Sequence, residues 1–137
     1  PTREKVADAV ATFSGEIMQA PPIFSAVKVD GHRAYASARM GKDVKIEPRK
    51  ATVHAIEVLK YEWPIVTIEV ACAKGFYVRA LARDLGKALG TGGYCLEIRR
   101  IEVGRFTLEM AKQLESLPEF LTQDDLLSPD QVEQLLL

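Results

Sequence analysis

A strand pattern that changes directly into a helix pattern, within residues 65–89, most restricts what this chain can fold into. Residues 65–72 alternate apolar and polar side chains, which predicts a half-buried strand. Beyond the Lys-Gly pair at 74–75, apolar side chains recur at helical spacing up to Gly90, which predicts an amphipathic helix. The apolar positions are Val66, Ile68, Val70 and Cys72 in the first pattern and Val78, Leu81, Ala82 and Leu85 in the second. We expect the helix to pack on the sheet through this apolar face.

The rest of the chain continues the alternation of strands and helices. A helix that Thr2 caps and Gly15 ends is expected first. The prolines of MQAPPIF, residues 18–24, exclude a helix there. The further expected elements are strands at 24–29, 51–60 and 94–103, a short helix at 33–41, and helical pieces at 108–117 and 129–137. This order predicts an α+β fold: a mixed, mostly antiparallel sheet with flanking helices.

The predicted strand at 94–103 contains a change of phase. Leu96 and Ile98 fall on one face of such a strand, whereas Ile101 and Val103 fall on the other. A bulge or bend at Arg99-Arg100 would reconcile the two halves, and bulges often redirect side chains near functional sites.

Length and composition exclude several classes of protein. The chain has 137 residues, 47% of them hydrophobic and 27% charged, as expected for one soluble globular domain. Its apolar runs fall short of the roughly 20 residues of a membrane span. Two cysteines without metal-ligand spacing predict neither a disulfide framework nor a metal site. We expect a reduced, cytoplasmic protein with no membrane or metal partner; the oligomeric state is left open, with a monomer expected.

The net charge of −1 conceals an uneven distribution. Residues 1–108 carry 17 basic against 12 acidic side chains, whereas residues 109–137 carry one against seven. The basic side chains concentrate in residues 28–50 and 74–105. Such segregation suits a polyanion, because Lys and Arg neutralise phosphates and release counterions. A solvated mixed surface explains the charge equally well at this point.

Arginine and aromatic side chains form the only chemical pattern that stands out. Arg79 lies in the first turn of the predicted helix beside Tyr77, where a cation usually has a specific anionic partner. Arg83 and Lys87 fit a solvated basic face of the same helix. Tyr35, between Arg33 and Arg39, completes a cation–aromatic–cation pattern suited to RNA.

Two long motifs make the chain resemble the TruB-type pseudouridine synthases. Residues 15–41 read GEIMQAPPIFSAVKVDGHRAYASARMG, similar to the family pattern Q-x-P-P-x-[YF]-S-A-x-K-x-x-G-x-x-x-Y-x-x-A-R-x-G. Residues 71–106 read ACAKGFYVRALARDLGKALGTGGYCLEIRRIEVGRF, similar to K-G-[TF]-Y-[IV]-R-x-[LI]-x-x-D-[LI]-G with a later [LI]-R-R. The order and separation of these motifs make the resemblance highly specific.

The resemblance implies an enzyme that isomerises uridine to pseudouridine in the T arm of tRNA, with no metal or organic cofactor. The target base is flipped out of the stack. By the same resemblance, Tyr77 packs against the flipped uracil, Arg79 pairs with the catalytic aspartate, and Ile98 lines the pocket. The further expected substrate-binding residues are Lys28, Tyr35, Arg39, Lys74, Arg99 and Arg100.

The chain also departs from the family pattern. Phe24 and Phe76 replace the commoner tyrosine and threonine. The aspartate-bearing segment of type G-x-L-D-x-x-A-x-G does not occur in residues 1–137. We therefore expect residues 1–137 to be the second part of a catalytic domain, with 109–137 as an acidic helical tail, and to be inactive alone. The alternative is a non-catalytic RNA-binding module derived from such an enzyme.

Overall fold

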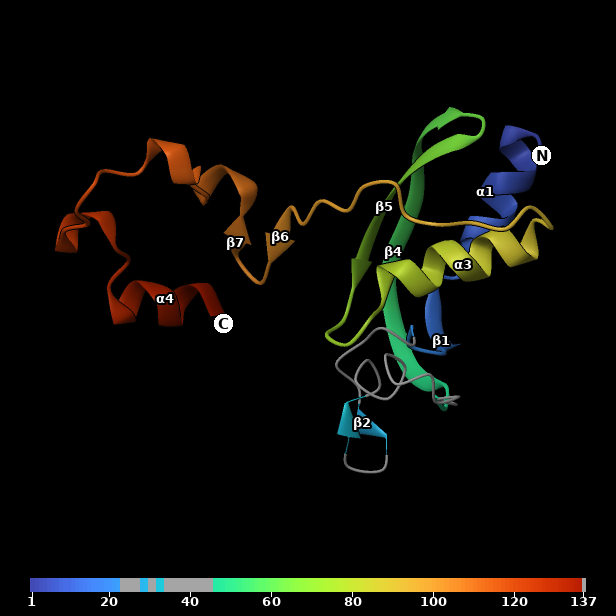
Figure 1. Cartoon of the computed structure of the whole chain (residues 1–137), viewed down its shortest axis with the longest axis horizontal. Helices are drawn as coiled ribbons and strands as arrows, with labels where there is room; N and C mark the ends of the chain where they lie inside the picture. The colour runs from blue at the N-terminus through green and yellow to red at the C-terminus, as the bar shows by residue number, and fades with distance from the viewer. Residues whose placement is uncertain (23–27, 30–31, 34–45, 137) are drawn as a thin grey trace. The chain divides into compact units, whose positions relative to one another are not determined.

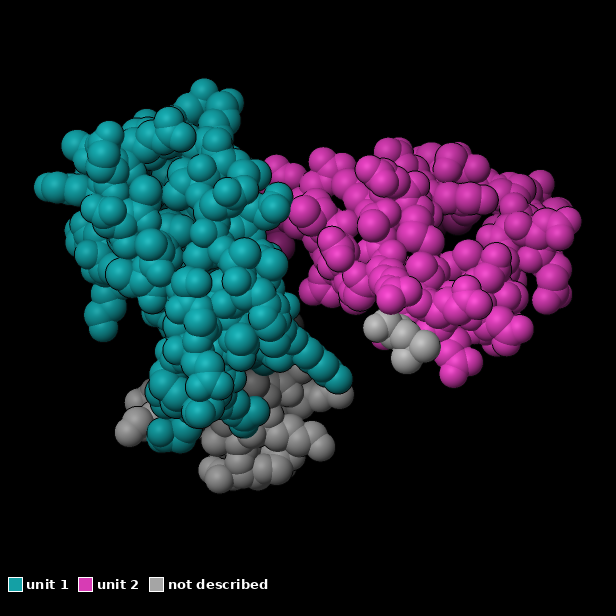
Figure 2. Space-filling model, turned by 180° about the vertical axis from the view of Figure 1, so that it is seen from behind, with its two compact units in different colours: residues 1–96 teal, residues 97–137 magenta. Residues whose placement is uncertain are grey.

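Figure 1 shows a computed structural model of the chain, which describes residues 1–22, 28–29, 32–33 and 46–136. These residues form two compact units, residues 1–96 and residues 97–137 (Figure 2). Among the helices described, none combines the length and the apolar content that crossing a membrane requires.

The first unit is built on an antiparallel sheet with the strand order β1-β4-β5. β1 (Gly15–Gln19) and β5 (Ile65–Cys72) lie on either side of the long central strand β4 (Arg49–Glu62). A separate short hairpin pairs β2 (Lys28–Val29) with β3 (His32–Arg33). The prediction of an α+β fold with a mostly antiparallel sheet is confirmed.

Two irregularities in β4 keep its apolar side chains on one face. The pairing of β4 with β5 shifts between Val53 and Ala55 and again between Val58 and Lys60, which leaves His54 and Leu59 as extra residues. Each extra residue reverses the alternation of faces beyond it. The inward-facing apolar positions of β4 are accordingly spaced by two, three, two and three residues: Ala51, Val53, Ile56, Val58 and Tyr61.

Two helices cover that face of the sheet and close the core. α1 (Arg3–Ala11) contributes Val6 and Val10, and α3 (Val78–Ala88) contributes Leu85, all of them buried. The partly buried residues packed around them are Ala9, Phe13, Ile56, Val58, Tyr61, Val66, Ile68 and Leu89. The predicted apolar faces of both helices therefore form the core, and Thr2 caps α1 as expected, its hydroxyl accepting a hydrogen bond from the Lys5 amide.

The segment after α3 folds back against the helix through three glycines. The backbone N–H groups of Thr91 and Gly92 donate to the carbonyl of Gly86, at 2.9 and 3.1 Å. A Cβ on Gly86 would lie 2.2 Å from the Gly92 carbonyl carbon, and one on Gly93 would lie 2.4 Å from the Ala82 carbonyl oxygen. Residues 91–95, the return segment, thus contact the helix backbone directly. The thiol of Cys95 reaches the carbonyl of Val78, 3.7 Å away, in the first turn of α3.

We predict that Gly86→Ala destabilises the protein. Helix propensity alone favours alanine by about 1 kcal/mol, but the added methyl would overlap backbone atoms that no rotamer change can move. We expect a net loss of about 1–3 kcal/mol, as for other overpacked sites. Urea denaturation followed by circular dichroism measures the change, with exposed Lys87→Ala as the control. A Gly86→Ala protein as stable as the original would contradict the close approach.

The second unit consists of short elements. β6 (Glu102–Val103) pairs with β7 (Phe106–Thr107), three 3-10 turns follow, and α4 spans Pro129–Leu136. The turns cover Leu108–Met110, Leu114–Ser116 and Gln123–Asp125. In the last of them, hydrogen bonds from the backbone amide and hydroxyl of Thr122 lower the pKa of Asp125 below its ordinary value.

Several predicted elements differ from the structure. The strand at 94–103 is wrong for most of its length, because residues 94–101 pair with no other strand among the described residues, so the predicted bulge at Arg99-Arg100 is not present either. The helix at 108–117 is also wrong, since 3-10 turns occupy that region. β1 was not predicted at all. Of the strand at 24–29 only Lys28–Val29 is described, and of the helix at 33–41 only Arg33, which lies in β3.

Candidate functional site at the start of helix α3

The start of α3 follows the end of β5 with only a short turn between them. The backbone N–H of Ala73 donates to the Thr52 carbonyl at 2.9 Å, which extends the pairing with β4 beyond the end of β5. Gly75 then adopts a φ of +94°, a left-handed conformation that favours glycine. Tyr77 is the N-cap residue of α3 and has extended backbone angles. The Lys-Gly pair therefore makes the turn that places Tyr77 and Arg79 at the edge of the sheet.

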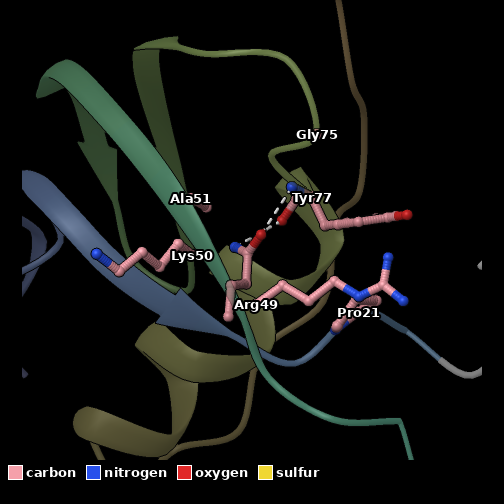
Figure 3. A pocket seen from close by; sticks show the side chains of 7 residues that line it. Pro21, Arg49, Lys50, Ala51, Gly75 and Tyr77 are labelled. Carbon is pink, nitrogen blue, oxygen red and sulfur yellow. Dashed lines mark hydrogen bonds between the residues drawn. The ribbon is translucent and has the colours of Figure 1, made fainter.

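A buried glutamine fastens this turn to β1. The side chain of Gln19 is only 2% exposed. Its Oε1 accepts a hydrogen bond from the backbone N–H of Tyr77 at 2.8 Å, and its Nε2 donates to the Tyr77 carbonyl at 3.0 Å (Figure 3). Both polar groups of the side chain are thus paired with one residue. No role is assigned to Gln19 by the sequence patterns, although it is the first residue of the family's Q-x-P-P motif.

Arg83 makes a second link between α3 and the end of β1. Its Nη2 donates to the Ala20 carbonyl at 3.0 Å, while Nε and Nη2 bind the two oxygens of Asp84 at 2.8 and 2.9 Å. The hydrogen bond with Asp84 raises the pKa of Arg83 above its ordinary value. The sequence assigns Arg83 to a solvated face; the side chain is 45% exposed, but it also connects two elements of the fold.

A hollow of about 160 Å³ lies beside this junction. Its lining residues come from the end of β1 and the residues just after it, from β4 and from the turn before α3: Gln19, Pro21, Arg49, Lys50, Ala51, Gly75 and Tyr77. The side chain of Tyr77 points away from the hydrogen bonds of its own backbone, and the side chain of Arg49 extends in the same direction in Figure 3. The hollow therefore brings the Tyr77 side chain together with the Arg49 cation of β4, a combination that suits a nucleic acid. Lys50 extends the other way in Figure 3 and pairs with Glu16 of β1 at 3.4 Å. Sequence spacing alone did not reveal the contribution of Arg49 and Lys50.

The return segment brings Cys95 to the same helix start. Partial burial raises the pKa of the Cys95 thiol, and the positive charge of Arg79 opposes that rise. Arg79 itself is exposed and takes part in an interaction within the fold. The charge of Arg79 therefore acts on a thiol contributed by a segment 16 residues further along the chain.

We predict that Arg79→Gln slows the alkylation of Cys95. Only the thiolate reacts, and loss of the neighbouring positive charge raises the thiol pKa further, so less thiolate is present at any pH below that pKa. Peptide mass spectrometry after timed iodoacetamide treatment measures Cys95, with exposed Cys72 as the internal reference. The matched control is Lys87→Gln, which removes an exposed cation about two turns further along the same helix. Equal rates in the two variants would contradict the proximity of Arg79 to Cys95.

The structure brings together only part of the predicted site. Tyr77, Arg79 and Lys74 lie around the start of α3, Tyr77 partly buried and the other two exposed. Ile98, Arg99 and Arg100 are exposed residues of the second unit. Lys28 lies in β2, and Tyr35 and Arg39 lie outside the described residues. Their assignments as site residues stay predictions.

Comparison with a solved structure supports the fold. A chain in the crystal structure of a Cbf5-Nop10-Gar1 complex superposes on this one with a TM-score of 0.68 and 31% sequence identity. The match covers 85% of this chain and 31% of that chain.

Comparison with protein families identifies the class. Residues 1–78 match the TruB family pseudouridylate synthase N-terminal domain, and residues 79–137 match the tRNA pseudouridylate synthase B C-terminal domain. These matches, with the fold, define a pseudouridylate synthase domain. More narrowly, the chain belongs to the TruB family.

Curated relatives give the same result. The tRNA pseudouridine synthase B of Parabacteroides distasonis is 44% identical over 123 residues, which cover 90% of this chain and 52% of the relative. The protein of the same name from Phocaeicola vulgatus is 46% identical over 125 residues, covering 91% and 53%. The chain thus spans about half the length of these relatives.

Proposed function

We propose that this chain forms part of a tRNA pseudouridine synthase, which isomerises uridine to pseudouridine in the T arm of tRNA. One observation carries the proposal. Tyr77 and Arg79, which match the family motif, lie at a helix start that hydrogen bonds tie to the neighbouring strand. A site that must hold a flipped nucleotide needs such fixed elements.

Tyr77 suits the recognition of an unstacked base. Its backbone is fixed by Gln19, whereas its side chain points away from that contact (Figure 3). Aromatic side chains stack on the faces of bases that have left a helix. We propose that the Tyr77 ring packs against the flipped uracil.

Arg79 suits a role beside a carboxylate. A guanidinium presents its N–H groups in a planar fork that matches both oxygens of a carboxylate. We propose that it pairs with the aspartate of the family's G-x-L-D-x-x-A-x-G segment, which attacks or transfers a proton during the cleavage and re-formation of the bond to the base. Residues 1–137 contain no such segment, so activity is tested with these residues joined to one.

The cations around the hollow suit the phosphates of the same RNA. Arg49 lines the hollow together with Tyr77, and Lys74 lies in the adjoining turn. Lys50 also lines it, but its ammonium pairs with Glu16 at 3.4 Å. Phosphate contacts position a nucleic acid without reading its sequence. The identity of the modified uridine would then depend on the shape of the T arm and on the base pocket.

We predict that binding to a T-arm hairpin weakens steeply with salt. Each neutralised phosphate adds about 0.7–0.9 to the slope of log K against log salt concentration. Arg49→Gln should reduce that slope by about one such contact. Lys60→Gln, at the far end of β4, is the control and should leave the slope unchanged. Fluorescence anisotropy at several salt concentrations measures both. A slope near zero for the original chain would remove the electrostatic basis of the proposal.

We predict that Arg79→Lys lowers the rate of pseudouridine formation but not RNA affinity. A lysine ammonium offers one point contact in place of the bidentate pair, so the rate should fall by about 10²-fold or more, as when an active site loses a charge-stabilising donor. The dissociation constant should stay within a few-fold. Chemical derivatisation of pseudouridine and primer extension measure the rate, with this chain joined to an aspartate-bearing segment of the family.

The control for this experiment is Lys87→Ala, an exposed substitution near the end of the same helix, which should leave the rate unchanged. A wild-type rate in Arg79→Lys would refute the role of Arg79. Binding without any pseudouridine formation by the joined, unsubstituted protein would instead favour a non-catalytic RNA-binding module.

A further inference from the structure

We propose that Gln19 is the positioning residue for Tyr77: its side-chain amide sets the place and orientation of the Tyr77 backbone, and through it the ring that packs against the base. The inference rests on the proposed function for its catalytic consequence. Its structural part, the hold on the Tyr77 peptide groups, stands on the geometry of Gln19 alone.

The hydrogen bonds reproduce one step of an antiparallel strand pairing. In such a pairing, one residue exchanges both its N–H and its C=O with a partner. Here the partner is the Gln19 amide, which accepts from the Tyr77 N–H at 2.8 Å and donates to the Tyr77 C=O at 3.0 Å. Two bonds to one residue restrict rotation as well as translation, which one bond would not.

The two hydrogen bonds differ in whether the Tyr77 group that makes each of them has another partner. The Tyr77 carbonyl also accepts from the backbone N–H groups of Ala80 and Leu81, at 3.0 and 3.1 Å. The Tyr77 N–H, within the described part of the chain, donates to Gln19. Because the Gln19 side chain is 2% exposed, water does not readily replace it. Loss of the amide would leave the N–H of the N-cap residue unpaired and free the turn before α3.

The support beneath Gln19 is itself fixed. Gln19 is the last residue of β1 and pairs in register with Arg49 of β4. The next residue, Ala20, is held by Arg83 from α3, and Pro21 is buried. The Gln19 amide therefore projects from a segment that is anchored on both sides. Because this segment is fixed, the amide can hold the Tyr77 backbone in place and does not move with it.

The test uses two substitutions that remove the bonds in different ways. Gln19→Leu keeps the side-chain volume but has no polar group, and Gln19→Asn keeps the amide but is one methylene too short to reach Tyr77. We expect both to lower the single-turnover rate of pseudouridine formation by about 10²-fold, the effect of displacing a reacting group by about 1 Å. RNA affinity should stay within about three-fold, because the phosphate-binding cations are unchanged.

A matched control separates positioning from general stability. Val53→Ala removes buried volume from β4, two residues along the strand from Ala51, which lines the same hollow. It should lower the midpoint of urea unfolding while leaving the single-turnover rate near wild type at temperatures where the fold is intact. If Gln19→Leu behaves like Val53→Ala, with lower stability and an unchanged rate, the positioning role is overturned.

A second measurement does not depend on catalysis. Amide hydrogen exchange by NMR on the 137-residue chain should show faster exchange at Tyr77 in Gln19→Asn, with Leu85 in the middle of α3 unchanged. Unchanged exchange at Tyr77 would overturn the proposal even if the rate fell. If the unsubstituted, joined protein formed no pseudouridine, the proposed function would fail, while the exchange data would still decide whether Gln19 holds Tyr77.

Discussion

The paired hydrogen bonds between the Gln19 amide and the Tyr77 backbone connect the end of β1 to the start of α3. Without them, the turn after β5 would be tied to the sheet mainly by the bond from Ala73 to Thr52. A glutamine is well suited to this place, because its side chain carries one acceptor and one donor at a fixed separation, as a peptide group does. The position of the start of α3, with its charged and aromatic residues, follows from this pairing together with the hydrogen bond from Arg83 to Ala20 and the packing of Leu85 in the core.

The elements that could be predicted are those whose signals are local. Thr2 caps a helix whose apolar face meets the core, and the pattern from Val66 to Leu85 gives a strand followed by a helix. The strand at 94–103 failed for a non-local reason. A strand exists only where another backbone pairs with it, and residues 94–101 have no such partner among the described residues. The apolar residues that suggested a strand, such as Leu96 and Ile98, remain exposed.

The candidate site also divides into residues that local sequence signals predict and residues that only the fold brings together. Motif spacing predicted Tyr77 and Arg79 as site residues, because both belong to one continuous stretch; these roles stay predictions. It could not identify Arg49 as a neighbour of Tyr77, since the two are brought together only by the pairing of β1 with β4 and by the turn at Gly75. Gln19 was visible as the first residue of the motif, but its side chain hydrogen-bonds to a residue 58 positions away. Site residues that come from segments far apart in the sequence can be identified only once the fold is known.

The direct contact between Gly86 and the return segment has a consequence for how the length of this region can vary. Backbone lies on backbone where Gly92 and Gly93 meet α3, so neither a side chain on Gly86 or Gly93 nor a bulged residue fits between them. An insertion or deletion between Gly90 and Cys95 would carry the thiol away from Val78 and from the neighbourhood of Arg79. The loop that leaves α3 therefore has a set number of residues, whereas the exposed turn at Trp63, between β4 and β5, has room for a longer connection.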